Sequence, residues 1–163
     1  MSAPKKAQKQ SPSKSQGVGI LINNAAAQNK GLDATLLTKL REICLALPEA
    51  VETVKWGHLT FEAGKKIFAV LDYYHGRPCI AFGTSREEQK KLCCDARFFP
   101  APYAANRGWV CLYADGALNW SEVRHILLAS YRLVALKRML RKLDGCGTAQ
   151  FRSQVEALAQ HPG

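Results

Sequence analysis

Residues 54–82 read VKWGHLTFEAGKKIFAVLDYYHGRPCIAF, and this stretch decides the fold. Apolar and polar side chains alternate through it in short runs, and glycine interrupts the runs three times. Alternation with a period of two is typical of half-buried strands, and glycine supplies the positive backbone angle of tight hairpin turns. The stretch therefore predicts short antiparallel strands, with hairpin turns at residues 63–64 and 74–77.

Helical patterns lie on both sides of these strands. The predicted helices cover residues 34–47, 86–95, 121–143 and 149–159. Asp33 can cap the first of them and Pro48 ends it, while Ser85 and Glu88 form a capping box for the second. Asn119 with Glu122 makes another capping pattern, before the third helix. One more strand is predicted over residues 109–113, between the second helix and the third.

The order of the predicted elements indicates an α+β fold, because the strands follow one another and do not alternate with helices as a parallel sheet requires. We expect a two-layer sandwich in which an antiparallel sheet of about four or five strands is covered by helices on one face. The sequence predicts a disordered basic arm over residues 1–30 and a single domain over residues 31–163.

Composition limits the protein's class. The chain has 163 residues, 47% of them hydrophobic and 22% charged, which are globular values. No apolar run approaches the roughly 20 residues that a bilayer requires, and the polar N-terminal start is unlike a secretory signal. Six cysteines lack the paired spacing typical of zinc sites, so we expect reduced thiols in a cytoplasmic protein without a structural metal.

Five landmarks follow one another along the chain. They are residues 56–61 (WGHLTF), 64–69 (GKKIFA), 100–103 (PAPY), 108–110 (GWV) and 130–131 (SY). In order and spacing they resemble the MmcQ/YjbR family of small bacterial proteins. The resemblance implies a compact two-layer α+β domain that binds DNA through a double-wing arrangement.

Net charge points to a polyanionic partner independently of any resemblance. The formal charge is +10, and much of it falls on the longest predicted helix. If that helix is continuous, a basic stripe covers about a third of its circumference. The stripe consists of Arg124, Tyr131, Arg132, Arg138 and Lys142. It is suited to a phosphate backbone, because arginine binds phosphate through paired hydrogen bonds. The alternative is the ordinary solvated face of an amphipathic helix.

The two hairpin tips offer a second basic surface. Lys65 and Lys66 lie at the first tip, and Arg77 lies beside the second. They are candidates for the wings that the resemblance implies, and each is a predicted contact to nucleic acid. The alternative for all three is that of ordinary exposed turn residues.

Aromatic residues of the landmarks are predicted to cover the sheet or enter the core. They are Trp56, Phe61, Phe68, Tyr103 and Trp109. His58 is the polar group inside the first landmark. A hydrogen-bonded structural histidine is the favoured interpretation, and a ligand or an acid-base group is the alternative.

Catalytic signatures are scarce. The sequence has no G-x-S-x-G elbow, glycine-rich phosphate loop or dinucleotide fingerprint. We expect a protein that is not an enzyme, needs no cofactor or metal, and contacts the phosphate backbone of nucleic acid, duplex DNA before RNA. The alternative is a protein–protein adaptor or small-ligand-binding domain that uses the open face of the sheet.

Overall fold

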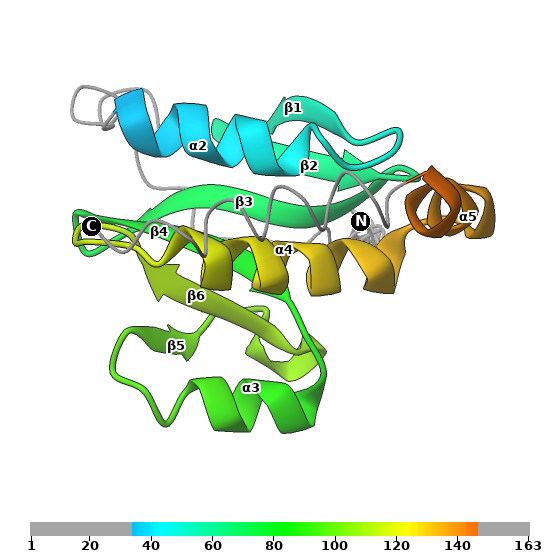
Figure 1. Ribbon diagram of the computed structural model, residues 1–163. Coiled ribbons are helices and arrows are strands. Elements are labelled where there is room, and N and C mark those ends of the chain that lie inside the picture. The colour runs from blue at the N-terminus through cyan, green and yellow to red at the C-terminus, as the bar shows by residue number, and fades with distance from the viewer. Residues whose placement is uncertain (1–33, 147–163) are drawn as a thin grey trace, which may run out of the picture.

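The computed structural model describes residues 34–146 (Figure 1). In chain order the elements are α2 (Ala34–Cys44), β1 (Val51–Lys55), β2 (His58–Ala63), β3 (Lys66–Tyr74), β4 (Arg77–Gly83), α3 (Arg86–Leu92), β5 (Phe98–Pro100), the 3-10 helix η2 (Ala105–Arg107), β6 (Trp109–Tyr113), α4 (Trp120–Val134) and α5 (Lys137–Cys146). The predicted arm, the cap at Asp33 and the predicted helix over residues 149–159 lie outside the described residues.

The strands form a six-stranded antiparallel sheet in the order β1-β2-β3-β4-β6-β5. The α+β prediction is confirmed, with more strands than the four or five expected. The additional strand is β5, over residues for which no strand was predicted. Pro100 is compatible with this strand because β5 is the edge of the sheet and needs no outward N–H.

Three two-residue turns connect the first four strands. They are residues 56–57, 64–65 and 75–76, and both residues of each turn have positive φ. That pair of angles is typical of type I′ turns, whose twist matches the right-handed twist of the flanking strands. Glycine occupies one position of each turn, and Trp56, Lys65 and His75 occupy the other. The glycine pattern thus predicted the meander correctly.

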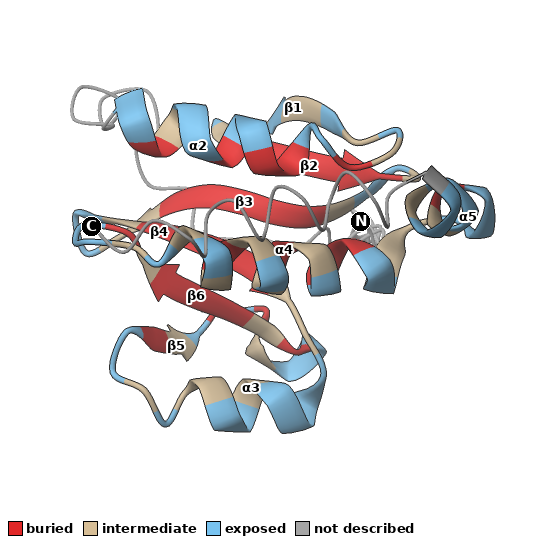
Figure 2. Cartoon of the chain, in the orientation of Figure 1, coloured by how far each residue is buried: buried red, intermediate tan, exposed pale blue. Residues whose placement is uncertain are grey.

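Helices α2 and α4 cover one face of the sheet (Figure 1). Phe61 and Phe68 of the sheet and Leu127 and Tyr131 of α4 are buried in this core, and Figure 2 shows the outer faces of both helices exposed. Ser130 joins the layers, because its hydroxyl donates to the Phe68 carbonyl at 2.6 Å and accepts from the backbone N–H of β4 at 3.0 Å. The two-layer arrangement is as the sequence predicted.

The other face of the sheet has a smaller core at β3, β4 and β6. Val70, Ala81 and Cys111 pack there against Ala101 and Ala104, which belong to the loop before β6. The Gln89 side chain of α3 holds this loop in place by donating to the carbonyls of residues 105 and 109, at 2.9 and 3.0 Å. The loop therefore covers part of the face that the long helices leave open.

The predicted long helix over residues 121–143 is wrong, because it is two helices. Asn119 caps α4 as the capping pattern predicted, but Ala135 ends it in an extended conformation with ψ of 144°. Neither glycine nor proline marks this point, so tertiary packing overrides helix propensity. The break lets Leu136 contact Gly64 and lets Met139 become fully buried. The basic residues on either side of Ala135 therefore do not share one helix face.

Candidate nucleic-acid interface and an adjacent cleft

The hairpin turn between β2 and β3 meets the corner between α4 and α5. A Cβ built on Gly64 would lie 2.8 Å from Leu136 Cγ, so the turn and the corner are in van der Waals contact. Lys65 and Lys66 follow Gly64, and Lys137 follows Leu136. Residues far apart in sequence therefore bring their positive charges to the same end of the molecule.

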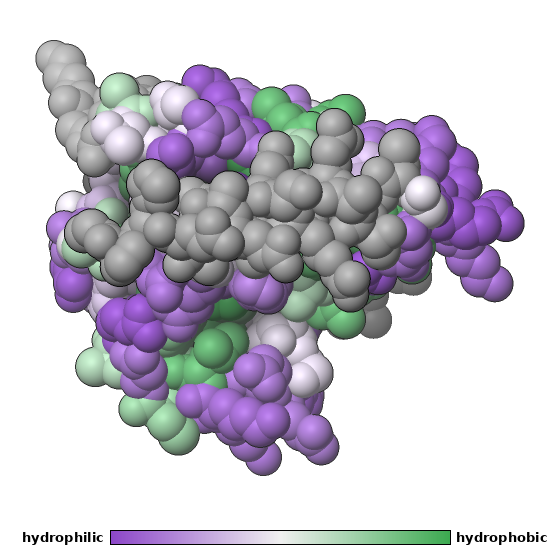
Figure 3. All heavy atoms as spheres, viewed as in Figure 1, coloured by the Kyte–Doolittle hydropathy of each residue, from purple (hydrophilic) through white to green (hydrophobic). Residues whose placement is uncertain are grey.

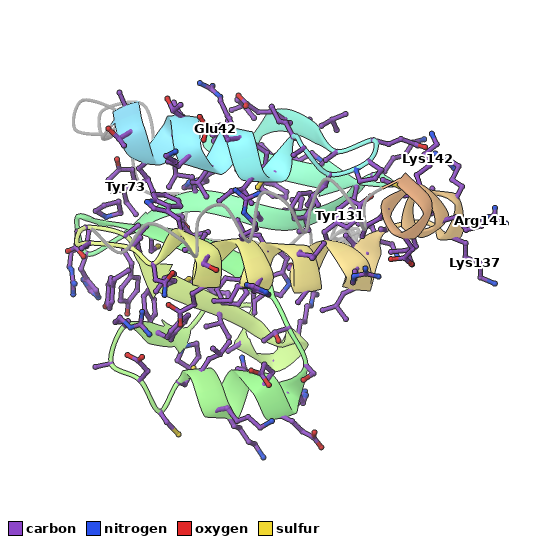
Figure 4. The ribbon with its side chains drawn as sticks, in the orientation of Figure 1. Glu42, Tyr73, Tyr131, Lys137, Arg141 and Lys142 are labelled. Atoms are coloured by element: carbon purple, nitrogen blue, oxygen red, sulfur yellow. The ribbon has the colours of Figure 1, made fainter. Side chains whose placement is uncertain are left out.

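We call four exposed residues the basic end: Lys65, Lys66, Lys137 and Arg141. No acidic side chain among residues 34–146 forms an ion pair with any of them. Figure 4 shows Lys137 and Arg141 pointing away from the fold, and Figure 3 shows hydrophilic side chains over α5. Surface cations without an ion pair keep their full charge for an incoming anion. The basic end is therefore the best candidate binding site for a polyanion.

Two residues of the predicted stripe, Arg138 and Lys142, form ion pairs with Glu49. Arg138 Nη2 lies 2.8 Å from one carboxylate oxygen and Lys142 Nζ lies 2.7 Å from the other. Hydrogen bonds from these two cations hold the pKa of Glu49 at about 2, well below its ordinary value. A phosphate would have to displace this carboxylate before it could bind either cation.

Two further predicted contacts are ion-paired elsewhere. Arg132 lies 2.7 Å from Asp144, and Arg77 lies 2.5 Å from Asp115. The Arg77 guanidinium also stacks on Tyr113, 3.7 Å from the ring centroid. Arg77 begins β4, so it lies at the opposite end of β3 from Lys66. The two hairpin tips are therefore not brought together on one surface.

Tyr131 is a core residue and not part of an exposed stripe. It is fully buried, and its hydroxyl donates to the Pro48 carbonyl at 2.7 Å. Its ring meets Phe68 edge to face, with 5.5 Å between centroids, and burial raises the pKa of the hydroxyl. Tyr131 thus has no exposed ring face for stacking. Arg124, from the same predicted stripe, is half-buried on α4.

A cleft of about 540 Å³ opens beside the basic end. It lies where β3 begins, β4 ends and β6 begins, and the C-terminal part of α4 forms another wall. The residues that line it include Lys55, Lys65, Lys66 and Arg107, two tryptophans, Trp56 and Trp109, and the apolar Ile67, Val70, Leu133 and Val134. No acidic residue lines it. Sequence reasoning missed this cleft.

The tryptophans of the landmarks are the sequence feature from which the cleft could have been predicted. Trp56 and Trp109 each adjoin a glycine and were predicted to cover the sheet or enter the core, as Phe61 and Phe68 do. Trp109 is half-buried and packs against the smaller core, as predicted, but the prediction is wrong for Trp56, which is 44% exposed. The prediction is also wrong for Tyr103, which is 72% exposed. An exposed tryptophan in a tight turn is unusual enough to suggest a binding surface.

His58 has the structural role that the sequence favoured. Its Nδ1 lies 3.0 Å from an Asp72 carboxylate oxygen, and about nine-tenths of each side chain is buried. On the neighbouring strand Lys55 forms an ion pair with the buried Glu62. These pairs neutralise the polar groups that β1, β2 and β3 place on the sheet face opposite α2 and α4.

Within residues 34–146 no group of three or more histidine, cysteine or acidic side chains is placed to hold a metal ion. The five cysteines whose side chains are described are free thiols, and burial raises the pKa of Cys44. None of the described helices combines the length and hydrophobicity needed to cross a bilayer.

The open antiparallel sheet with helices over one face defines a small two-layer α+β domain. The chain belongs to the YjbR family, whose family model matches residues 45–133. It is 27% identical over 101 residues to the uncharacterized protein YjbR of Escherichia coli K12, a match that covers 59% of this chain and 84% of the relative. The O157:H7 strain has a relative with the same identity and coverage.

A solved structure shows the same fold. The crystal structure of Deinococcus radiodurans protein DR2400, which carries the domain DUF419, superposes with a TM-score of 0.53 at 20% identity. The superposition covers 74% of this chain and 87% of that protein. At this identity the likeness concerns the fold and not the function.

Proposed function

We propose that this protein binds nucleic acid without chemical conversion and contacts the phosphate backbone through the basic end. The single observation that carries the proposal is the gathering of Lys65, Lys66, Lys137 and Arg141 at one end, each exposed and none ion-paired with an acid among the described residues. Regularly spaced phosphates release counterions when such cations bind them, and this release drives association.

Six of the eight contacts predicted from the sequence fall into two groups, and Arg124 and the buried Tyr131 belong to neither. Lys65 and Lys66 can meet phosphate directly, as their exposure permits. Arg77, Arg132, Arg138 and Lys142 would first exchange a carboxylate for a phosphate, so they are secondary contacts. Such exchange is feasible because exposed ion pairs are worth only about 0–1 kcal/mol.

Fluorescence anisotropy of a labelled 20-base-pair duplex, titrated with the full chain at several salt concentrations, tests the proposal. With about four phosphates neutralised, the logarithm of the affinity should fall against the logarithm of the salt concentration with a slope of roughly −3.6. In the double variant Lys137→Glu/Arg141→Glu the slope should be shallower by about 2, because two contacts are lost.

A matched control separates local contacts from net charge. Lys90→Glu/Lys91→Glu changes the net charge by the same amount on α3, which lies away from α5 at the β5 edge of the sheet (Figure 1). This control should keep most of the wild-type slope. Equal losses in the two double variants, or wild-type binding without salt dependence, would refute the proposal.

A small-ligand-binding domain is the second candidate, and the cleft is the observation that favours it. Its volume of about 540 Å³ is within the range of roughly 300–1,000 Å³ that small-molecule sites occupy. The adaptor alternative has weaker support. The exposed large apolar side chains of the described residues are divided between several places: the end of α2 (Leu45), edge strand β1 and the turn after it (Val51, Val54, Trp56), the loop before η2 (Tyr103) and the α4–α5 corner (Leu133, Leu136).

A further inference from the structure

We infer that the cleft holds one unpaired nucleotide of a single strand, with the base against tryptophan and the phosphate against the lysines of the β2–β3 turn. The inference rests on the proposed function, since it names the form of nucleic acid that the basic end serves. The charge, the aromatic surface and the position of the cleft each contribute to it.

The charge of the cleft selects an anion. Four cationic residues line it and no acidic residue does. Lys55 is neutralised by Glu62, which leaves Lys65, Lys66 and Arg107 without an ion pair among the described residues. A neutral ligand would leave these charges uncompensated, whereas a phosphate would receive charge-assisted hydrogen bonds from them.

The walls of the cleft select a flat, apolar group attached to that anion. Trp56 and Trp109 provide indole surface, and Ile67, Leu133 and Val134 provide aliphatic surface. Trp56 is 44% exposed and Leu133 is 61% exposed, so both can still bury area against a ligand. A nucleobase carries this combination of planar ring and nearby phosphate, and aromatic stacking accepts any base.

The position of the cleft favours a strand over a duplex. Lys65 and Lys66 belong both to the cleft lining and to the basic end, so a backbone that crosses the basic end passes the mouth of the cleft. A paired base inside a duplex cannot enter, because its faces are covered by its neighbours. An unpaired base can turn out from its strand and enter the cleft without breaking a base pair.

The test compares two labelled probes, a twelve-nucleotide oligothymidylate and a twelve-base-pair duplex, titrated with the full chain at matched salt. Trp56→Ala should weaken binding of the single strand by about five- to 150-fold, which is the range for loss of one base–aromatic stack. Binding of the duplex should change less than twofold. Trp56→Phe should restore most of the single-strand affinity, since it returns an aromatic face.

A second variant protects the test against a folding defect. Arg107→Gln removes an exposed cation that lines the cleft and lies outside the basic end. It should weaken the single strand severalfold and reduce its salt slope by about 0.7. A thermal melt of Arg107→Gln should match that of the wild type, because the Arg107 side chain is exposed.

The outcomes separate this inference from the proposed function. Equal effects of Trp56→Ala on the two probes, or none, would overturn the cleft assignment while Lys137→Glu/Arg141→Glu still reports on backbone binding. Binding of neither probe would overturn both proposals. Binding of free thymidine monophosphate without binding of the strand would overturn the inference as stated, because it would assign the cleft to a free nucleotide.

Discussion

Gly108 is a position where one added methyl group should damage the fold. Its φ of 82° lies in the left-handed region, and an added Cβ would lie 2.2 Å from the carbonyl oxygen of Thr84. The left-handed conformation costs an L-residue about 1–2 kcal/mol. The overlap also pushes apart two backbones joined by the 2.9 Å hydrogen bond from the Thr84 N–H to the Gly108 carbonyl, a bond worth about 1 kcal/mol. Gly108→Ala should therefore lower the free energy of unfolding by about 2–3 kcal/mol.

Urea unfolding followed by tryptophan fluorescence measures this loss, and Gly76→Ala is the matched control. Gly76 has a similar φ of 76°, but a Cβ there would meet nothing within 4 Å. The control should therefore lose only the conformational penalty of about 1–2 kcal/mol. Equal losses in the two variants would refute the reasoning, because they would show that the close approach to Thr84 carries no steric cost.

Three further predictions concern hydrogen bonds and pH. Tyr131→Phe removes the hydroxyl that donates to Pro48 and should lower the unfolding free energy, measured in urea, by about 1 kcal/mol; no loss would mean that water replaces the hydroxyl. Ser130→Ala leaves two buried backbone groups without their partner and should cost about 2–3 kcal/mol in the same assay, and a loss below that of Tyr131→Phe would contradict this. Because the pKa of Glu49 is lowered, its carboxylate contributes fully to the stability of the fold above pH 4.5, its ordinary pKa. This contribution is progressively lost as the pH falls toward 2. Glu49→Gln should therefore flatten the dependence of stability on pH between these values, and an unchanged profile would show that the carboxylate does not stabilise the fold.

Local sequence signals determined most of the fold. Glycines at the turns and alternating side chains between them predicted β1 to β4, and the Ser85 and Asn119 caps were confirmed. The break at Ala135 and strand β5 could not be found in this way. The break depends on the packing of Leu136 against Gly64, and β5 depends on pairing with β6, so both are tertiary effects.

The candidate site was harder to predict than the fold. The sequence identified Lys65 and Lys66, but it could not show that Glu49 lies against Arg138 and Lys142, about ninety positions further along the chain. Helix periodicity placed Tyr131 on a basic face, whereas in α4 it lies on the buried side together with Val123, Leu127 and Ser130. The cleft assembles residues from β3, β4, β6 and α4, and no local pattern reports such an assembly.

The three type I′ turns also restrict how the chain can change in length. Each turn holds only two residues, and side chains alternate faces along every strand, so one inserted residue would reverse the faces of the strand that follows. The connection between β6 and α4 carries no such restriction, because it does not set a hairpin register. Insertions and deletions should therefore be tolerated in that connection and excluded from the meander.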